Sequence, residues 1–155
     1  MPASTSEPTS GPISGPLDVH DLAGDLRGAI AVASRRIRAE RGAAALSDPQ
    51  YSALIWLLQR GPLTPGQLAD LERIQPPAMT RTVNCLVDLG LARKGEHPSD
   101  KRAVVVSLTD EGRDEALETR RRRLEWLEGR LGSFTDDERV LLAQAATLLR
   151  KIASS

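Results

Sequence analysis

The chain has few of the residues that carry covalent or metal chemistry. Its 155 residues include one cysteine, Cys85, and two histidines, which excludes an intramolecular disulfide and any multi-cysteine zinc site. His20 and His97 with one cysteine make a poor metal-ligand set. No nucleophile elbow or phosphate-binding glycine-rich loop is present either. The sequence therefore predicts a protein that is not an enzyme and needs no metal or cofactor.

Aromatic residues, net charge and long apolar runs are also scarce. Aromatic residues make up only 3% of the chain, which leaves few surfaces for stacking unpaired bases and argues against a single-stranded nucleic-acid ligand. The 21 basic and 21 acidic residues cancel, so any basic footprint for duplex DNA has to be local. No apolar run approaches the ~18 residues that cross a membrane, and no secretory signal is visible. We therefore expect a cytoplasmic protein without a membrane partner.

A proline- and serine-rich stretch precedes one mainly helical domain. Residues 1–16 hold four prolines, four serines and too little apolar surface to offset the entropy of ordering, so we expect a disordered arm. Residues 17–155 form the domain. Within it, apolar residues recur at helical spacing over 18–41 and again over 113–152. The segment between these helix patterns, 47–109, is organised differently.

Two short helices and a pair of strands follow one another in that middle segment. Thr64 with Gln67 three residues later is a capping box that opens one helix, and a second helix begins near Gln75. The face of this second helix that is expected to point inward comprises Met79, Val83, Leu86 and Leu89. Two extended segments, 91–94 and 104–108, then flank a polar loop. The order predicts a mainly α fold with a small β-hairpin wing, a winged helix-turn-helix.

The second of these helices can place polar side chains in the major groove of DNA, with its N-terminal residues toward the base edges. In this sequence those residues are Gln75, Pro77, Ala78, Thr80, Arg81 and Asn84. Arg81 can make a bidentate contact to guanine, and Gln75 or Asn84 can pair with adenine. Ala78 can contact a thymine methyl group. Two core helices with solvated polar faces would carry similar residues, so the helices alone leave both interpretations open.

Further DNA contacts are expected from the preceding helix and from the wing. Thr64 and Gln67 can hold phosphates. In the wing loop, Asp100 and Arg102 lie two residues apart on an extended chain, so Asp100 can orient the Arg102 guanidinium while the loop tip enters the minor groove. The other wing residues expected to contact DNA are Arg93, Lys94, Ser99 and Lys101. The alternative for Asp100 and Arg102 is an ordinary surface ion pair of little energetic value.

Two runs of sequence carry a family resemblance. The run Ala-Met-Thr-Arg-Thr-Val-Asn over 78–84, followed by Gly90 and Arg93, resembles the recognition helix of the multiple antibiotic resistance regulator (MarR) family. The run over 97–109, followed by Gly112, resembles that family's wing signature. In the signature, a Pro-x-Asp-x-Arg loop leads into an aliphatic strand, a Leu-Thr pair and a glycine. The two runs occur in the right order and at the right spacing, which makes the match a strong one.

The resemblance implies an obligate homodimer of winged helix-turn-helix protomers in which the first, fifth and sixth helices interlock. The apolar stripes over 18–41 and 113–152 agree with such dimerisation helices, and a monomeric bundle is the alternative. The resemblance also implies a sequence-specific regulator that binds a pseudo-palindromic site on double-stranded DNA, most often as a repressor. The usual effector in the family is a small aromatic or phenolic acid. Tyr51 and Trp56 are candidates to line its pocket, with core packing as the alternative.

The sequence departs from the family pattern on the recognition helix. Pro76 and Pro77 stand where serine or another polar residue is usual, and Cys85 and Leu89 stand where arginine or lysine often occurs. The prolines can narrow or shift the base contacts, and the changes at Cys85 and Leu89 lower the positive charge on the outer part of that helix. Nothing beside Cys85 in sequence marks it as a reactive thiolate, so we expect an ordinary, semi-buried thiol. The alternative functions are a redox-sensing regulator that acts through Cys85 and a winged-helix module that contacts only proteins.

Overall fold

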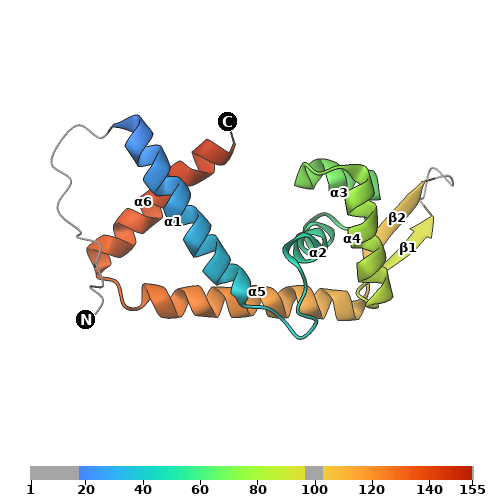
Figure 1. The fold of residues 1–155 in the computed structure, drawn as a ribbon. Coiled ribbons are helices and arrows are strands. Elements are labelled where there is room, and N and C mark those ends of the chain that lie inside the picture. The colour runs from blue at the N-terminus through green and yellow to red at the C-terminus, as the bar shows by residue number, and fades with distance from the viewer. Residues whose placement is uncertain (1–17, 97–102, 155) are drawn as a thin grey trace, which may run out of the picture. The chain divides into compact units, whose positions relative to one another are not determined.

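The computed structural model describes residues 18–96 and 103–154 and contains a helix-turn-helix followed by a two-stranded hairpin (Figure 1). Along the chain the elements are α1 (Val19–Ala39), α2 (Asp48–Arg60), α3 (Pro65–Glu72), α4 (Pro76–Asp88), β1 (Ala92–Glu96), β2 (Val104–Leu108), α5 (Asp110–Leu131) and α6 (Asp136–Ala153). This order confirms the predicted fold class. The expected arm, residues 1–16, lies outside the described residues. Among the helices that are described, none has the length and apolar character needed to cross a bilayer.

The chain divides into two compact units, residues 1–36 and residues 37–155. The described part of the first unit, 18–36, lies almost entirely in α1, which buries none of its residues. In the second unit, α6 also buries none of its residues. The packed core therefore comes from α2, α3, α4, the hairpin and the first half of α5.

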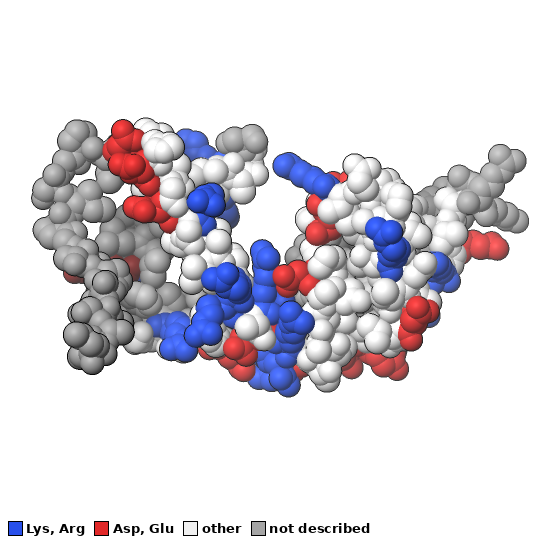
Figure 2. Space-filling model, viewed as in Figure 1, with Lys and Arg blue, Asp and Glu red and all other residues white. Residues whose placement is uncertain are grey.

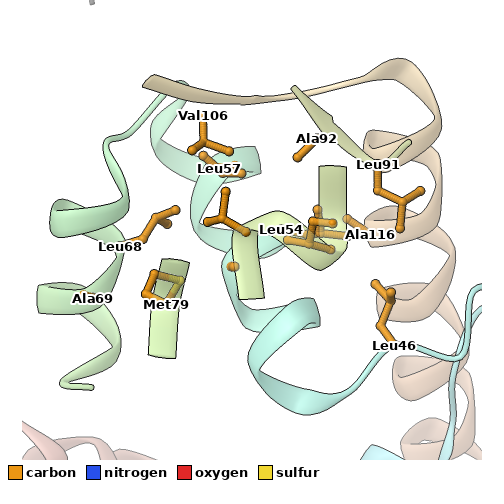
Figure 3. Close-up of a cluster of buried hydrophobic side chains, with 13 residues drawn as sticks. Leu46, Leu54, Leu57, Leu68, Ala69, Met79, Leu91, Ala92, Val106 and Ala116 are labelled. Atoms are coloured by element: carbon orange, nitrogen blue, oxygen red, sulfur yellow. The ribbon is translucent and has the colours of Figure 1, made fainter. Parts of the chain in front are cut away.

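An aliphatic core joins α2, α3, α4 and β2. The side chains that form its centre, each no more than 1% exposed, are Leu54, Leu68, Met79, Val83, Leu86 and Val106. Figure 3 shows that four of them, Leu54, Leu68, Met79 and Val106, lie around one shared space although they come from four different elements. The predicted inward positions on α4 are confirmed at Met79, Val83 and Leu86. Leu89 is 51% exposed, contrary to the prediction, because the helical repeat that joins the other three falls next on residue 90.

The hairpin is antiparallel and is fastened to the linker that precedes α3. Its strands pair from Ala92 with Leu108 to Glu96 with Val104, so β1 lies slightly further along the chain than the predicted 91–94. Leu63, between α2 and α3, exchanges two backbone hydrogen bonds with Val106, at 3.0 and 2.8 Å. The wing and the helix-turn-helix are therefore held together by backbone as well as by side-chain packing.

The start of α5 packs against the chain that leaves α4. The Thr109 hydroxyl donates to the carbonyl oxygen of Gly90 at 2.7 Å and accepts from the Gly112 N–H at 3.0 Å. A Cβ atom at Gly112 would overlap the carbonyl oxygen of Leu91. The threonine and the glycine of the wing signature thus have a physical cause. The threonine caps α5, and the glycine admits the neighbouring backbone.

We expect Gly112→Ala to lower the free energy of unfolding by about 3 kcal/mol, because the added methyl group would force the Leu91 backbone away from α5. Urea denaturation at a fixed protein concentration measures the change. Gly66→Ala is the matched control, since the nearest atom to its new methyl group is Thr64 Oγ1 at 3.8 Å. Alanine in that helix should raise the free energy of unfolding by about 0.5–1 kcal/mol. Equal stabilities for the two variants would show that the close approach at Gly112 is unimportant.

Candidate nucleic-acid interface

A single left-handed residue makes the turn between α3 and α4. Arg73 has φ 52° and ψ 41°, and the N–H of the next residue, Ile74, donates to Ala69 O at 3.0 Å. This conformation is uncommon for a residue with a Cβ and costs on the order of 1 kcal/mol. No sequence pattern marks Arg73 as a site residue, yet its side chain is exposed directly before the recognition helix.

The exposed face of α4 brings most of the predicted base-contacting residues together. Pro77, Arg81 and Asn84 follow one another at helical spacing and are all exposed, opposite the face that enters the core. The other predicted residues on this helix are Gln75 and Thr80, which are exposed, and Ala78, which is partly buried. Within the described residues, the Arg81 guanidinium makes no hydrogen bond or ion pair, so it can contact a ligand without first losing a partner.

The first four helical positions of α4, residues 76–79, offer no free backbone N–H. Pro76 and Pro77 have no N–H, and the N–H groups of Ala78 and Met79 both donate to Gln75 O, at 2.9 and 3.3 Å. A helix N-terminus ordinarily leaves several N–H groups available to an anion. The two prolines reduce that capacity, so phosphate contacts near this end depend mainly on side chains.

The wing reaches α4 through a hydrogen bond between side chains. Lys94 Nζ on β1 donates to Asn84 Oδ1 at 2.6 Å. The predicted pairing of Asn84 with adenine uses that oxygen as an acceptor, and in the structure the oxygen already accepts a bond from Lys94. The other wing cation described, Arg93, donates through Nε to Ser107 Oγ at 3.2 Å across the hairpin. The predicted contacts of Ser99, Asp100, Lys101 and Arg102 lie outside the described residues and stay predictions.

The residues predicted to hold phosphates on α3 serve first as its cap. Thr64 Oγ1 accepts from the Gln67 N–H at 3.1 Å, and Gln67 Oε1 accepts from the Thr64 N–H at 2.8 Å, which confirms the capping box. Both side chains keep a donor, because the Thr64 hydroxyl hydrogen and the Gln67 amide group are not used in these bonds. A phosphate contact from either residue is therefore compatible with the cap.

Cys85 is exposed on α4, so the expectation of a semi-buried thiol is wrong. The buried stripe of the helix passes through Val83 and Leu86, which leaves position 85 on the outer side. The thiol stands next in sequence to Asn84 and one turn after Arg81, beside the face that carries the predicted base contacts.

Basic side chains are more concentrated on α5 than on the winged part. On the face shown in Figure 2, Lys and Arg on the winged part are few and separated, whereas the sequence of α5 contains the consecutive run Arg120–Arg123. Part of the α5 charge is neutralised locally. Hydrogen bonds from Arg121 and Arg122 lower the pKa of the Glu118 carboxyl to about 2. Among the described residues on this face, no broad basic surface therefore surrounds α4, in agreement with the zero net charge.

A cavity of about 570 Å³ opens beside α2 and α5. Its lining residues are Arg38, Asp48, Pro49, Tyr51, Ser52, Ile55, Leu58, Gln59, Glu72, Arg120 and Arg123. Tyr51, one of the two predicted pocket residues, is among them, whereas Trp56 is not. The lining combines three arginines and two acids with aliphatic and aromatic surface, a mixture suited to a small amphipathic molecule.

Arg123 organises the floor of this cavity. Its guanidinium carbon lies 4.0 Å from the centroid of the Tyr51 ring, and its Nε donates to the carbonyl oxygen of Glu40 at 3.1 Å. Arg123 Nη2 lies 3.7 Å from Asp48 Oδ1, and among the described residues neither of these buried atoms makes a hydrogen bond. Burial raises the pKa of Tyr51, while Arg123 and Arg120 partly oppose that rise. The phenol is therefore a neutral hydrogen-bonding group at pH 7.

Glu72 connects the cavity to the helix-turn-helix. It is the last residue of α3 and lines the cavity, and one of its carboxylate oxygens accepts hydrogen bonds from Trp56 Nε1, at 2.5 Å, and from Ser52 Oγ. Trp56, predicted as a pocket residue, thus acts behind the lining by holding Glu72. Sequence reasoning missed Glu72, because a lone acid at the end of a helix carries no motif.

Comparisons with known proteins agree with this geometry. The sequence profile of the MarR family matches residues 46–104. An HTH-type transcriptional regulator of Mycobacterium tuberculosis is 41% identical over 128 residues, which cover 83% of this chain and 90% of that protein. A MarR family protein from Bacillus stearothermophilus has a solved structure with TM-score 0.74 and 27% identity, covering 88% of this chain and 96% of that one. The PcaV transcriptional regulator from Streptomyces coelicolor, solved with its natural ligand, has TM-score 0.66 and 21% identity, covering 92% and 99%.

Proposed function

Because this chain belongs to the MarR family of transcriptional regulators, we propose that it binds a specific duplex sequence through α4 and represses transcription in the cytoplasm. Residues 47–109 are the DNA-binding part. The observation that carries the proposal is the exposed row of Pro77, Arg81 and Asn84 on a helix whose opposite face is fixed in the core. Such a helix can enter a major groove without rearrangement.

The proposed contacts divide into base-reading and phosphate-holding groups. Base edges are read by the α4 residues Gln75, Pro77, Ala78, Thr80, Arg81 and Asn84. Phosphates and the adjacent groove are contacted by Thr64, Gln67, Arg93, Lys94 and the wing residues Ser99, Asp100, Lys101 and Arg102. We add Arg73 to the residues that contact phosphates, because its strained backbone places a cation at the start of α4.

We expect Arg81→Ala to weaken binding to the preferred duplex by about 1–3 kcal/mol, or roughly fivefold to 150-fold, because a bidentate base contact is lost. The preferred duplex is first enriched from a random library, and affinity is then measured by fluorescence anisotropy at fixed ionic strength. Arg139→Ala on α6 removes the same charge from an exposed ion pair with Asp136 and should change affinity less than twofold. Failure to enrich any duplex would favour a protein-interaction module instead. Equal losses of affinity in the two variants would show that Arg81 does not contact the bases.

We further propose that the chain acts as a homodimer through the helices at 18–41 and 113–152. On α6, Leu141, Leu148 and Ile152 are each more than 60% exposed. Leu117 and Leu124 of α5 and several apolar residues of α1 are exposed as well. Soluble monomers rarely expose so many large apolar side chains, whereas obligate interfaces bury them. Two protomers would present their α4 helices to successive major grooves about one turn, or ~34 Å, apart.

The dimer is tested by placing a charge in the α6 stripe. Leu148→Glu should shift the mass measured by light scattering from about twice 16.8 kDa toward 16.8 kDa, because a carboxylate would have to be desolvated at the interface. Ala143→Glu adds the same charge to an exposed residue on the opposite side of α6 and should leave the mass unchanged. A wild-type mass of one chain would contradict the proposal directly.

We also propose that the cavity beside Tyr51 takes a small aromatic or phenolic acid as an effector. Arg38, Arg120 and Arg123 supply cations for a carboxylate, and the Tyr51 ring supplies an aromatic wall. A ligand in the cavity could affect the recognition helix through Glu72, because Glu72 lines the cavity and is the last residue of α3. Release of DNA would follow if the ligand favoured a protomer spacing that no longer fits the two half-sites. A structurally similar protein, PcaV, was solved in complex with its natural ligand, which supports the proposal that this chain binds one as well.

Hydroxybenzoic acids are suitable probes of this cavity. We expect at least one of them to release the preferred duplex. Arg120→Gln should raise the acid concentration needed for release, because it removes one of the cavity's cations. The increase should be only several-fold, because Arg120 is exposed and an exposed ion pair contributes little. Arg122→Gln is the control, since that guanidinium is already bonded to Glu118 on the outer side of α5. Release that is equally sensitive to both substitutions, or no release by any of these acids, would contradict the assignment.

A further inference from the structure

The bond between the wing and the recognition helix fixes the orientation of one amide group. Lys94 Nζ lies 2.6 Å from the Asn84 side chain. An ammonium group has only donors, so the Asn84 atom that faces it has to be the carbonyl oxygen Oδ1 and not the nitrogen Nδ2. The Asn84 NH₂ group is therefore directed away from Lys94.

This oriented amide belongs to the exposed row on α4. Asn84 follows Pro77 and Arg81 at helical spacing, and both Asn84 and Lys94 are exposed. A charge-assisted hydrogen bond of this length is stronger than one between neutral groups. The bond should therefore persist when a duplex approaches, and the pair would meet the bases as one unit.

The pair offers mainly donors to a base edge. Asn84 Nδ2 carries two hydrogens, and Lys94 Nζ has two more besides the one it gives to Asn84. A free asparagine reads adenine by donating to N7 and accepting from the N6 amino group. Oδ1 has two lone pairs, and one of them accepts from Lys94. An adenine N6 amino group that approached the other lone pair would lie beside the ammonium, which is itself a donor, so adenine is disfavoured. Guanine presents two acceptors, N7 and O6, and complements the pair.

Building on the proposed DNA-binding function, we propose that Asn84 and Lys94 form a donor pair that selects guanine over adenine at one position of each half-site. Lys94 is the positioning residue, because it holds the amide in the donor orientation. The assignment replaces the expectation that Asn84 reads adenine. It also gives this wing residue a role in sequence choice as well as in phosphate binding.

Substitution of Lys94 separates the two roles. In Lys94→Met the amide is free to turn and offer Oδ1, so the preference for guanine at that position should fall by about tenfold and adenine should gain. Arg93→Met is the matched control. It removes one cation from the adjacent position of the same strand, but Arg93 is bonded to Ser107 and not to Asn84. It should lower affinity at every sequence and leave the base preferences unchanged.

The experiment enriches duplexes from one randomised library with wild-type protein, Lys94→Met and Arg93→Met at the same ionic strength. Because both lysine and arginine are exposed, thermal melting should confirm that each variant is folded. The proposal is supported if a guanine position of the wild-type motif changes toward adenine in Lys94→Met alone. It is overturned if Lys94→Met keeps the wild-type motif, or if no wild-type position favours guanine over adenine. Failure of the wild-type protein to enrich any motif would instead refute the proposed DNA-binding function.

Discussion

One shared aliphatic core determines how the DNA-binding part of this molecule is presented. Leu54, Leu68, Met79 and Val106 come from four elements and meet in a single space, so no element can turn without opening a cavity. Since α4 commits its Met79 face to this core, its Arg81 face has to point outward. The wing is tied to the same unit through the backbone bonds between Leu63 and Val106. The proposed reading face is therefore a consequence of packing and does not depend on the mobility of α4.

Local chemistry made much of this fold predictable. Thr64 with Gln67 predicted where α3 begins, and the structure has both bonds of that capping box. The helical spacing of Met79, Val83 and Leu86 predicted the buried face of α4, and hence which residues face solvent. The prediction was wrong at Leu89, because the spacing of Met79, Val83 and Leu86 continues to residue 90 and not to residue 89. It was also wrong about the exposure of Cys85, which lies between the buried residues Val83 and Leu86 in sequence but on the outer side of the helix.

What could not be predicted were contacts between side chains distant in sequence. The bonds from Trp56 and Ser52 to Glu72 join α2 to α3, and the bond from Lys94 to Asn84 joins β1 to α4. Neither leaves a periodic or motif-like trace, because each depends on how two elements pack. These contacts change the interpretation of residues that the sequence did single out. Trp56 moves from the pocket wall to a supporting position, and Asn84 becomes an oriented donor.

We propose above all that the outward face of α4 lies in the major groove of a specific duplex. Dimethyl sulfate methylates guanine N7 in the major groove and adenine N3 in the minor groove, so protection of a bound operator distinguishes the two grooves. We expect protection of guanine N7 in two clusters about 10 base pairs apart, one for each α4 of a dimer. Protection confined to adenine N3, or no protection at saturating protein, would contradict it.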